Sequence, residues 1–254
     1  MGNAESPRGR IVLMMPALDE EEALPLVLRD LERVRRTTPG PHVDEIVVVD
    51  NGSRDRTPEI ARAAGATLLC EPRRGYGAAC QRAIQHLRQD PPDVLLFMDA
   101  DHSDDAEDIP FLLRPIVEEG YDMVIGSRTL GHSDPGALFP QARFGNWLAT
   151  GLIRLRFGFR YTDLGPFRAV RFALLERMAL ADQDFGWTVE MQVRALQVGA
   201  RITEVPVRYR KRVGRSKISG TVSGSLKAGT KILSTLWKLR SPGAATPRMS
   251  VRTP

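Results

Sequence analysis

The sequence has few features of secreted, disulfide-bonded or membrane-spanning proteins. Only two of its 254 residues are cysteine, and this pair, Cys70 and Cys80, matches no zinc-ligand spacing and provides no disulfide framework. The first ten residues lack the apolar core of a signal peptide. No apolar run reaches the roughly 18 residues that a membrane-spanning helix needs. We therefore expect a reduced compartment and a chain that is soluble or peripheral to a membrane.

Internal repeats, low-complexity linkers and abundant aromatic residues are also absent. A composition of 42% hydrophobic and 26% charged residues is ordinary for a globular protein. The length allows one large α/β domain or two small ones. The net charge is +5, and bases dominate residues 201–238, which favours an anionic partner such as phosphate, nucleic acid or a membrane surface. The basic run 208–217 has only Tyr209 for base stacking, so we expect no nucleic-acid binding.

Short apolar strand patterns alternate with helical patterns through the first half of the chain. This order predicts an α/β fold with a doubly wound, mostly parallel sheet. Strands are expected at residues 11–15, 46–49, 67–70, 94–98, 123–126 and 202–209. In the less regular second half we expect a polar loop at 127–140 and a helix at 144–156. Thr57 is expected to cap a short helix, and Pro206 should confine the last strand to an edge of the sheet.

Two carboxylates, Asp99 and Asp101, directly follow the apolar run that begins at Val94. Ligands of open parallel sheets bind just beyond the carboxyl ends of the strands, and alternate residues of an extended segment point the same way. Because Mg²⁺ favours a few carboxylates together with substrate phosphates, one interpretation is a site for a metal ion and a diphosphate. An acidic helix start near Ala106 explains the same pattern. These residues alone do not separate the two interpretations.

Four other residues and one segment are further candidates for function, and most of them also have a structural explanation. Asp50 ends the second expected strand, where it could bind a nucleobase or ribose or simply cap a turn. Gly75 precedes a helix whose N-terminus could bind phosphate, although a Gly-x-Gly pattern is more often a turn. Asp163 and Glu190 are candidate general bases, and a capping or solvated role is the more common explanation for Glu190. The flexible basic run 208–217 could neutralise a diphosphate leaving group or be a solvated charge run.

In their order and spacing these motifs resemble the family 2 glycosyltransferases of the GT-A fold. The similarity is greatest to the dolichyl- and polyprenyl-phosphate mannosyl- and glucosyltransferases, and it covers roughly residues 10 to 235. The motifs that carry it lie at residues 16–20, 49–55, 74–77, 99–101, 126–128, 162–168 and 214–217.

The resemblance and the chain composition together divide the sequence into four parts. Residues 10–225 form a single GT-A domain, in which a doubly wound, mostly parallel nucleotide-binding sheet is flanked by helices and joined to an irregular acceptor-side half. Residues 1–9 and 241–254 are polar and expected to be disordered. Residues 226–240 are expected to form an amphipathic helix that either lies on a membrane surface or packs against the domain.

The resemblance also implies roles for individual residues. Asp99 and Asp101 would bind Mg²⁺ or Mn²⁺ on the donor diphosphate, while Asp101, Asp163 and Arg128 would be the catalytic residues. Asp163 would act as a base or would orient the acceptor. The nucleotide sugar would contact Pro16, Ala17, Glu20, Asp50, Gly75, Asp99, Ala100, Arg212, Ser216 and Lys217. The acceptor would contact Arg128, Arg143, Arg168 and Glu190.

The function implied is inverting transfer of a hexose from UDP-glucose or GDP-mannose to a polyprenyl phosphate. Alternatives are a soluble acceptor (a small alcohol, a polysaccharide or a peptide) and a non-catalytic nucleotide-sugar-binding protein. Ser103 stands where the family commonly has glutamine, and Leu18 and Asp19 stand where tyrosine and asparagine are usual. The C-terminal membrane spans of many relatives have no counterpart in the sequence. We expect a cytoplasmic protein, with peripheral attachment to the inner face of the membrane as a second option.

Overall fold

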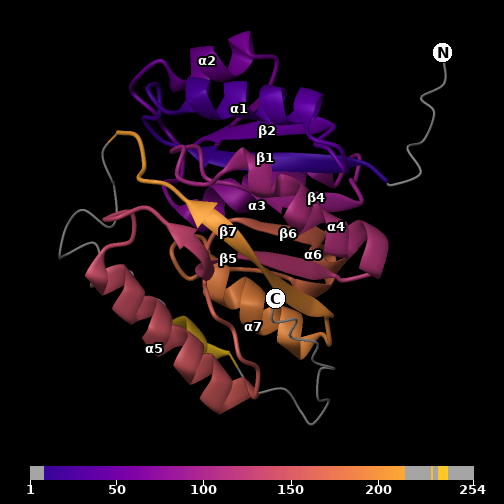
Figure 1. Ribbon diagram of the computed structural model, residues 1–254, viewed down its shortest axis with the longest axis vertical. Helices are drawn as coiled ribbons and strands as arrows, with labels where there is room; N and C mark the ends of the chain where they lie inside the picture. The colour runs from indigo at the N-terminus through magenta and orange to yellow at the C-terminus, as the bar shows by residue number, and fades with distance from the viewer. Residues whose placement is uncertain (1–8, 215–229, 231–233, 240–254) are drawn as a thin grey trace.

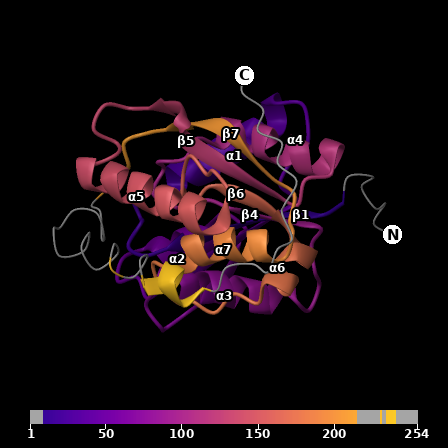
Figure 2. The same cartoon turned by 90° about the horizontal axis from the view of Figure 1, so that it is seen from below.

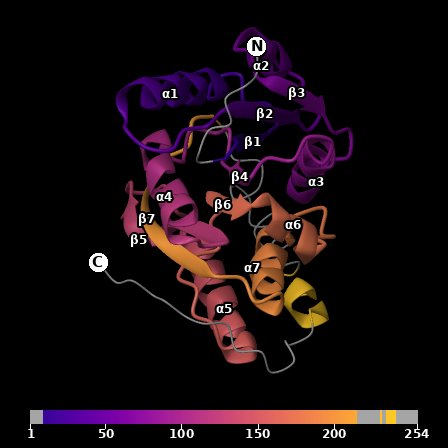
Figure 3. The same cartoon turned by 90° about the vertical axis from the view of Figure 1, so that its right-hand side faces the viewer.

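A seven-stranded sheet crosses the molecule, and helices cover both of its faces (Figures 1 and 3). The computed structural model describes residues 9–214, 230 and 234–239. The strand order is β3-β2-β1-β4-β6-β5-β7. The strands are β1 (Ile11–Ala17), β2 (Glu45–Asp50), β3 (Thr67–Cys70), β4 (Val94–Phe97), β5 (Met123–Ser133), β6 (Arg168–Arg171) and β7 (Ile202–Tyr209). Only β6 runs against its neighbours, which confirms the predicted mostly parallel α/β sheet.

The helices form two layers because the side chains of each strand alternate between the two faces of the sheet. Leu13 of β1 packs in one core cluster with α1, α2 and α4, whereas Val12 and Met14 pack in the other with α3, α5, α6 and α7. The helices are α1 (Leu24–Thr37), α2 (Thr57–Ala63), α3 (Tyr76–Leu87), η1 (Ala106–Asp108), α4 (Ile109–Glu119), α5 (Pro140–Phe157), α6 (Phe172–Met178) and α7 (Trp187–Gln197). Among the described helices, none has the length and apolar character that crossing a membrane requires.

Two local predictions are wrong. The expected loop at 127–140 is partly strand, because β5 continues to Ser133 alongside β7 after an irregularity in register beyond Ser127. Thr57 does not cap α2 from outside, because it is the first helical residue and its backbone N–H donates to Asp55 Oδ1 at 3.0 Å. The prediction for Pro206 is confirmed, since β7 is an edge strand.

The expected C-terminal helix is described only at residue 230 and at 234–239. Leu236 and Leu239 are buried in the same core cluster as α7. This short stretch therefore packs against the domain. Ser216, Lys217, residues 1–8 and the tail 241–254 lie outside the described residues.

The direction of the strands places many loops at one end of the sheet, where the parallel strands terminate. Six parallel strands end there, and β6 begins there because it runs the opposite way. The chain moves outward from β1 to β3 and then returns to the other side of β1 with β4. Ligands of open α/β sheets bind at such a switch in strand order. The loops after β1 and β4 are thus the expected position of a site.

Candidate active site

A cavity of about 550 Å³ lies beyond the carboxyl ends of β1 and β4. Most of the residues predicted to bind the donor line it, namely Pro16, Ala17, Glu20, Gly75, Asp99, Ala100, Asp101 and Arg212. Asp50 is not among its lining residues. The Asp50 carboxylate instead accepts a hydrogen bond from the Ser53 backbone N–H at 3.1 Å, as expected of a turn cap.

Three carboxylates gather in the turn after β4. Asp104 Oδ2 accepts from the Asp99 N–H at 3.1 Å, and Asp101 Oδ1 accepts from the Ser103 N–H at 2.9 Å and hydroxyl at 2.5 Å. Burial, together with the charges of Asp101 and Asp104, raises the pKa of Asp99 well above its usual range. Burial, again with the charge of Asp101, raises the pKa of Asp104 to about 7.

This cluster suits a cation with ligands from a bound substrate. The Asp104 Oδ1 atom is buried and has no hydrogen-bond partner among the described residues, and a nearby cation would relieve the mutual repulsion of the three carboxylates. Within the described part of the chain, His, Cys, Asp and Glu nowhere form a complete metal site from three or more residues. Mg²⁺ commonly takes one or two carboxylates and completes its shell with water and phosphate oxygens, so Asp99 and Asp101 fit this use.

The chain after β7 places Arg212 beside these carboxylates. The N–H groups of Arg210 and Val213 donate to the carbonyl oxygens of Ser103 and Asp101 at 2.7 and 3.0 Å. These bonds hold the segment against the turn. The Arg212 guanidinium then lies 3.0 Å from Glu20 and 3.4 Å from Asp101. A positive charge is thus fixed at the wall of the cavity, where a diphosphate would need one.

The Arg210 side chain strengthens this attachment. Its guanidinium pairs with Asp105 at 2.6 Å and with Asp30 of α1 at 3.0 Å. Asp30 also bonds His102 Nε2 at 3.0 Å. This contact holds the His102 ring half-buried between α1 and the turn.

A second cavity, of about 820 Å³, lies between α5, the outer part of β5 and the loop before β6. Its walls contain the arginines predicted to bind the acceptor phosphate, Arg128 and Arg143, and two more, Arg154 and Arg160. Apolar lining is also present at Leu138 and other positions. The combination suits a ligand with an anionic group and an apolar part.

Asp163 and Arg128 form a buried ion pair at this cavity. The Arg128 backbone N–H and Nε donate to Asp163 Oδ2 at 2.8 and 2.7 Å, and Nη2 donates to Oδ1 at 2.7 Å. Burial alone would raise the pKa of Asp163, but the charge and hydrogen bonds of Arg128 outweigh it and hold that pKa below its usual value. A carboxylate of low pKa is a weak proton acceptor, so the geometry suits positioning better than general-base catalysis.

The same ion pair is close to the carboxylate cluster. Burial raises the pKa of both Asp99 and Asp104, and the charge of Arg128 offsets a part of that rise. The Arg128 guanidinium lies 5.0 Å from the centre of the Tyr209 ring at the end of β7. Arg128 therefore lies at the second cavity and near the carboxylates that line the first. After the ligands predicted for them, the first is called the donor-side cavity and the second the acceptor-side cavity.

Arg168 and Glu190 lie elsewhere than predicted. Neither is among the lining residues of these two cavities. Arg168 is fully buried, and its guanidinium donates to carbonyl oxygens that include Gly165 and Thr188. Glu190 accepts from the Ala181 and Asp182 N–H groups at 3.0 and 2.7 Å. Both side chains support loops, since their polar atoms are engaged by the backbone.

Sequence reasoning missed three contributors. Asn51 joins the loops after β2 and β3, since its amide nitrogen donates to Arg73 O at 2.7 Å and its oxygen accepts from the Gly75 N–H at 2.8 Å. In the sequence, Asn51 is marked only by its place in the motif at residues 49–55. Asp104 was visible as a further acid in the same run. Phe185 lines the first cavity and has no pattern that identifies it.

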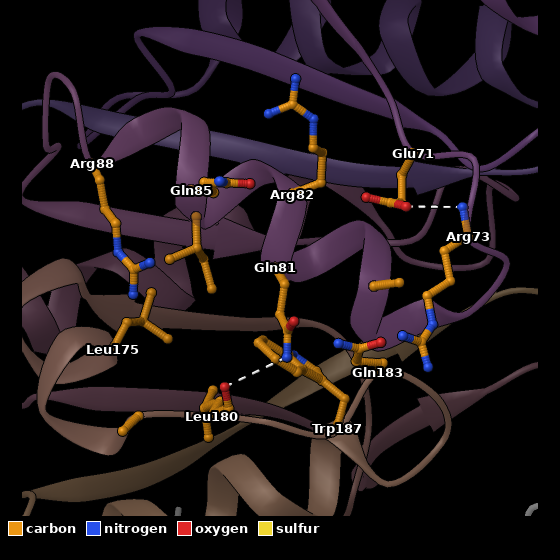
Figure 4. A pocket seen from close by; sticks show the side chains of 13 residues that line it. Glu71, Arg73, Gln81, Arg82, Gln85, Arg88, Leu175, Leu180, Gln183 and Trp187 are labelled. Carbon is orange, nitrogen blue, oxygen red and sulfur yellow. Dashed lines mark hydrogen bonds between the residues drawn. The ribbon is translucent and has the colours of Figure 1, made fainter.

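A third cavity, of about 300 Å³, lies between α3, α6 and α7 (Figure 4). Gln81 spans it and donates to Leu180 O at 3.5 Å. Glu71 already accepts from the Arg73 N–H at 2.8 Å. Because it has no paired carboxylates, this cavity is a weaker candidate for catalysis than the other two.

Known proteins resemble this chain in sequence and in fold. The model of the family described as Glycosyl transferase family 2 matches residues 12–182. Dolichyl-phosphate hexose transferase of Haloferax volcanii is 33% identical and covers 85% of this chain and 89% of its own. Undecaprenyl-phosphate mannosyltransferase of Micrococcus luteus is 31% identical, with 85% and 90% covered. A solved structure of glucosyl-3-phosphoglycerate synthase from Mycobacterium tuberculosis with Mn²⁺, UDP and glucosyl-3-phosphoglycerate shares the fold, with a TM-score of 0.66, 21% identity and 93% and 82% coverage.

Proposed function

Because the chain belongs to glycosyl transferase family 2, we propose that it transfers a hexose from UDP-glucose or GDP-mannose to a polyprenyl phosphate. The observation that carries the proposal is the presence of two cavities, one lined by Asp99 and Asp101 and the other by several arginines, with Arg128 of the second near enough to act on the carboxylates of the first. Two relatives above 30% identity are named for transfer to dolichyl or undecaprenyl phosphate.

On the donor side, Asp99 and Asp101 would hold Mg²⁺ or Mn²⁺. The ion would supply Lewis-acid stabilisation of the charge that develops on the leaving diphosphate. Arg212 lies beside the same carboxylates and would bind the diphosphate, with Ser216 and Lys217 as further proposed contacts. Pro16, Ala17 and Glu20 would surround the nucleotide, with Asp50 supporting the turn beside it.

On the acceptor side, Arg128 and Arg143 would bind the acceptor phosphate. A phosphate monoester is already anionic, so attack on the anomeric carbon requires little deprotonation. Asp163 would therefore orient Arg128 rather than remove a proton, in agreement with its lowered pKa. Direct displacement would invert the configuration of the anomeric carbon.

The test is transfer of radiolabelled hexose from each donor to a polyprenyl phosphate, with Mn²⁺ or Mg²⁺ present. Labelled product should partition into organic solvent, and the Asp101→Asn substitution should reduce its formation by about 100-fold or more, the size of loss typical when transition-state charge stabilisation is removed. The thermal unfolding midpoint should change little.

The matched control is Asp90→Asn, since Asp90 is an exposed carboxylate paired with Arg10 at the opposite end of β4. This variant should keep full activity. Labelled product that remains in the aqueous phase would identify a soluble acceptor. Donor binding without any transfer would identify a non-catalytic nucleotide-sugar-binding protein, and either result would contradict the proposal.

A further inference from the structure

The exposed large apolar side chains of the described residues are concentrated around α5. Seven such side chains are exposed. Phe111 lies on α4, away from the others. The remaining six lie on α5, on the segments leading to it, or beside its C-terminal end: Leu130, Phe139, Phe144, Trp147, Leu155 and Trp237. Figure 1 shows α5 at the periphery of the molecule.

The helix α5 is apolar on two opposite faces. Ala149, Ile153 and other residues of its inner face are buried in the core. At 100° per residue, Phe144 and Leu155 lie nearly opposite these positions, with Trp147 at the edge of the same outer face. Their exposed fractions are 61%, 84% and 68% respectively. A surface helix of a globular domain normally has polar residues there, so this face is suited to an apolar partner.

The charge around this outer face has one sign. Residues 135–162 contain four arginines and no lysine, aspartate or glutamate. By the same helical spacing, Arg143 and Arg154 flank the apolar stripe on one side and Arg156 flanks it on the other. Arg156 also stacks over the Trp237 ring at 5.7 Å, which brings another exposed aromatic beside the helix. Arginines on both sides of an aromatic and aliphatic stripe are typical of helices that lie in a lipid interface.

We infer that the outer face of α5, consisting of Phe144, Trp147 and Leu155 with the flanking arginines, binds the surface of an anionic lipid bilayer. A second copy of the chain is a poorer partner, because a two-fold interface would bring this arginine-rich surface against itself. Trp147, Arg143 and Arg154 also line the acceptor-side cavity, so that cavity would open at the bilayer. The inference deepens the proposed function and rests on it for the identity of the lipid substrate.

The test is co-sedimentation of the full chain with vesicles of phosphatidylcholine alone or mixed with phosphatidylglycerol. No acceptor, donor or metal is added, so binding is measured independently of transfer. Wild-type protein should bind the mixed vesicles. The double variant Phe144→Ser/Leu155→Ser should bind about tenfold or more weakly, since it removes two apolar side chains from the contact, while its unfolding midpoint should stay near that of the wild type.

The matched control is Phe111→Ser, which removes an equally large exposed side chain from α4 and should leave vesicle binding unchanged. Transfer to a short-chain polyprenyl phosphate in detergent should be unaffected in the double variant, so a failure of the proposed function would be detected separately. Absence of wild-type binding to the mixed vesicles would overturn the inference. So would equal losses in the two variants, or a dimer that the double variant converts to a monomer in light scattering.

Discussion

At the scale of single residues, the buried pair of Arg128 and Asp163 gives the sharpest expectation. Replacing Arg128 by methionine leaves a carboxylate that is 1% exposed without its counter-charge, which should cost about 3–5 kcal/mol at neutral pH. Without Arg128, burial should raise the folded-state pKa of Asp163 above its unfolded value. The loss in free energy of unfolding should therefore be smaller at pH 5 than at pH 7.5. Urea unfolding at the two pH values measures it.

The double variant Arg128→Met/Asp163→Asn is the control for this experiment. It contains no unpaired buried charge, so it should recover part of the stability lost by Arg128→Met alone. Equal stability of the single and double variants at both pH values would show that the charge on Asp163 is not the cause.

Glu204 of β7 has a raised pKa in the wild-type protein, in contrast to the lowered pKa of Asp163. Burial raises its pKa to about 7 from 4.5, although its carboxylate accepts from the Thr162 and Asp163 N–H groups. The folded state thus holds a proton that the unfolded state loses, and ionisation of Glu204 should lower the stability by about 2 kcal/mol from pH 5 to pH 8. The buried Asp99 and Asp104, whose pKa values are also raised, should add to this fall. Glu204→Gln keeps an acceptor oxygen and should reduce the fall in stability by about 2 kcal/mol in urea unfolding, whereas exposed Glu176→Gln should leave the fall unchanged.

At the residue scale, the sequence located side chains whose place follows directly from the end of a strand. Asp99, Asp101 and the residues after β1 line one cavity because a buried strand determines where its carboxyl end lies. Arg168 and Glu190 could not be placed in this way, since whether a charged side chain faces a cavity or the backbone of its own domain depends on packing between distant segments.

At the scale of elements, the N-terminus of α3 contacts the loop that contains Asp184 and Phe185. These two residues line the donor-side cavity. The Ala78 N–H donates to Gln183 O at 2.9 Å, and a Cβ added to Gly77 would lie 2.8 Å from the Gln183 carbonyl carbon. Gly77→Ala should therefore displace the loop that contains Asp184 and Phe185. Because this loop lines the donor-side cavity, we expect the KM for the donor to rise by about tenfold. That rise corresponds to a loss of roughly 1.4 kcal/mol in donor binding.

Gly145→Ala is the matched control for this substitution. Gly145 lies within α5, and a Cβ there meets nothing within 4 Å. The variant should keep the donor KM and gain about 0.5–1 kcal/mol of stability from improved helix propensity. A donor KM that stays at the wild-type value in Gly77→Ala would contradict the proposed importance of this loop.

Element types were predictable where periodicity is strong, as in β1, β4 and α5. The outer part of β5 was not, because polar residues beyond Ser127 indicate a loop when taken alone. Those residues form a strand only because β7 provides hydrogen-bond partners from some 80 residues further along the chain. Such long-range pairing has no local signal.

At the scale of the whole molecule, donor binding should stabilise the entire domain by mass action. A ligand at 100 times its Kd adds about 2.7 kcal/mol, equivalent to a rise of roughly 5–10 °C in Tm for a chain of this size. We expect this rise for the true donor, UDP-glucose or GDP-mannose, in the presence of Mn²⁺. Thermal unfolding of wild type and Asp101→Asn with each sugar nucleotide, with and without Mn²⁺, measures it.

The Asp101→Asn variant should lose the Mn²⁺-dependent part of the shift. A shift of equal size in that variant would remove Asp101 from the metal site. Asp90→Asn should behave as wild type, since its exposed carboxylate lies at the far end of β4.

The architecture was predictable because repeated β-α units in this order have few ways to fold. The reversal of β6 was not predicted, since four residues with an apolar centre do not specify direction. That direction is decided by pairing with both β4 and β5.

The reversal of β6 makes residues 134–167 an excursion between two hydrogen-bonded neighbours. The chain leaves the sheet from β5, builds α5 and the Asp163 loop, and re-enters in the adjacent position as β6 (Figure 2). Such a segment can be lengthened, shortened or exchanged without rethreading any other strand. Proteins that descend from one ancestral chain could therefore use different sugar acceptors and still bind the same sugar-nucleotide donor.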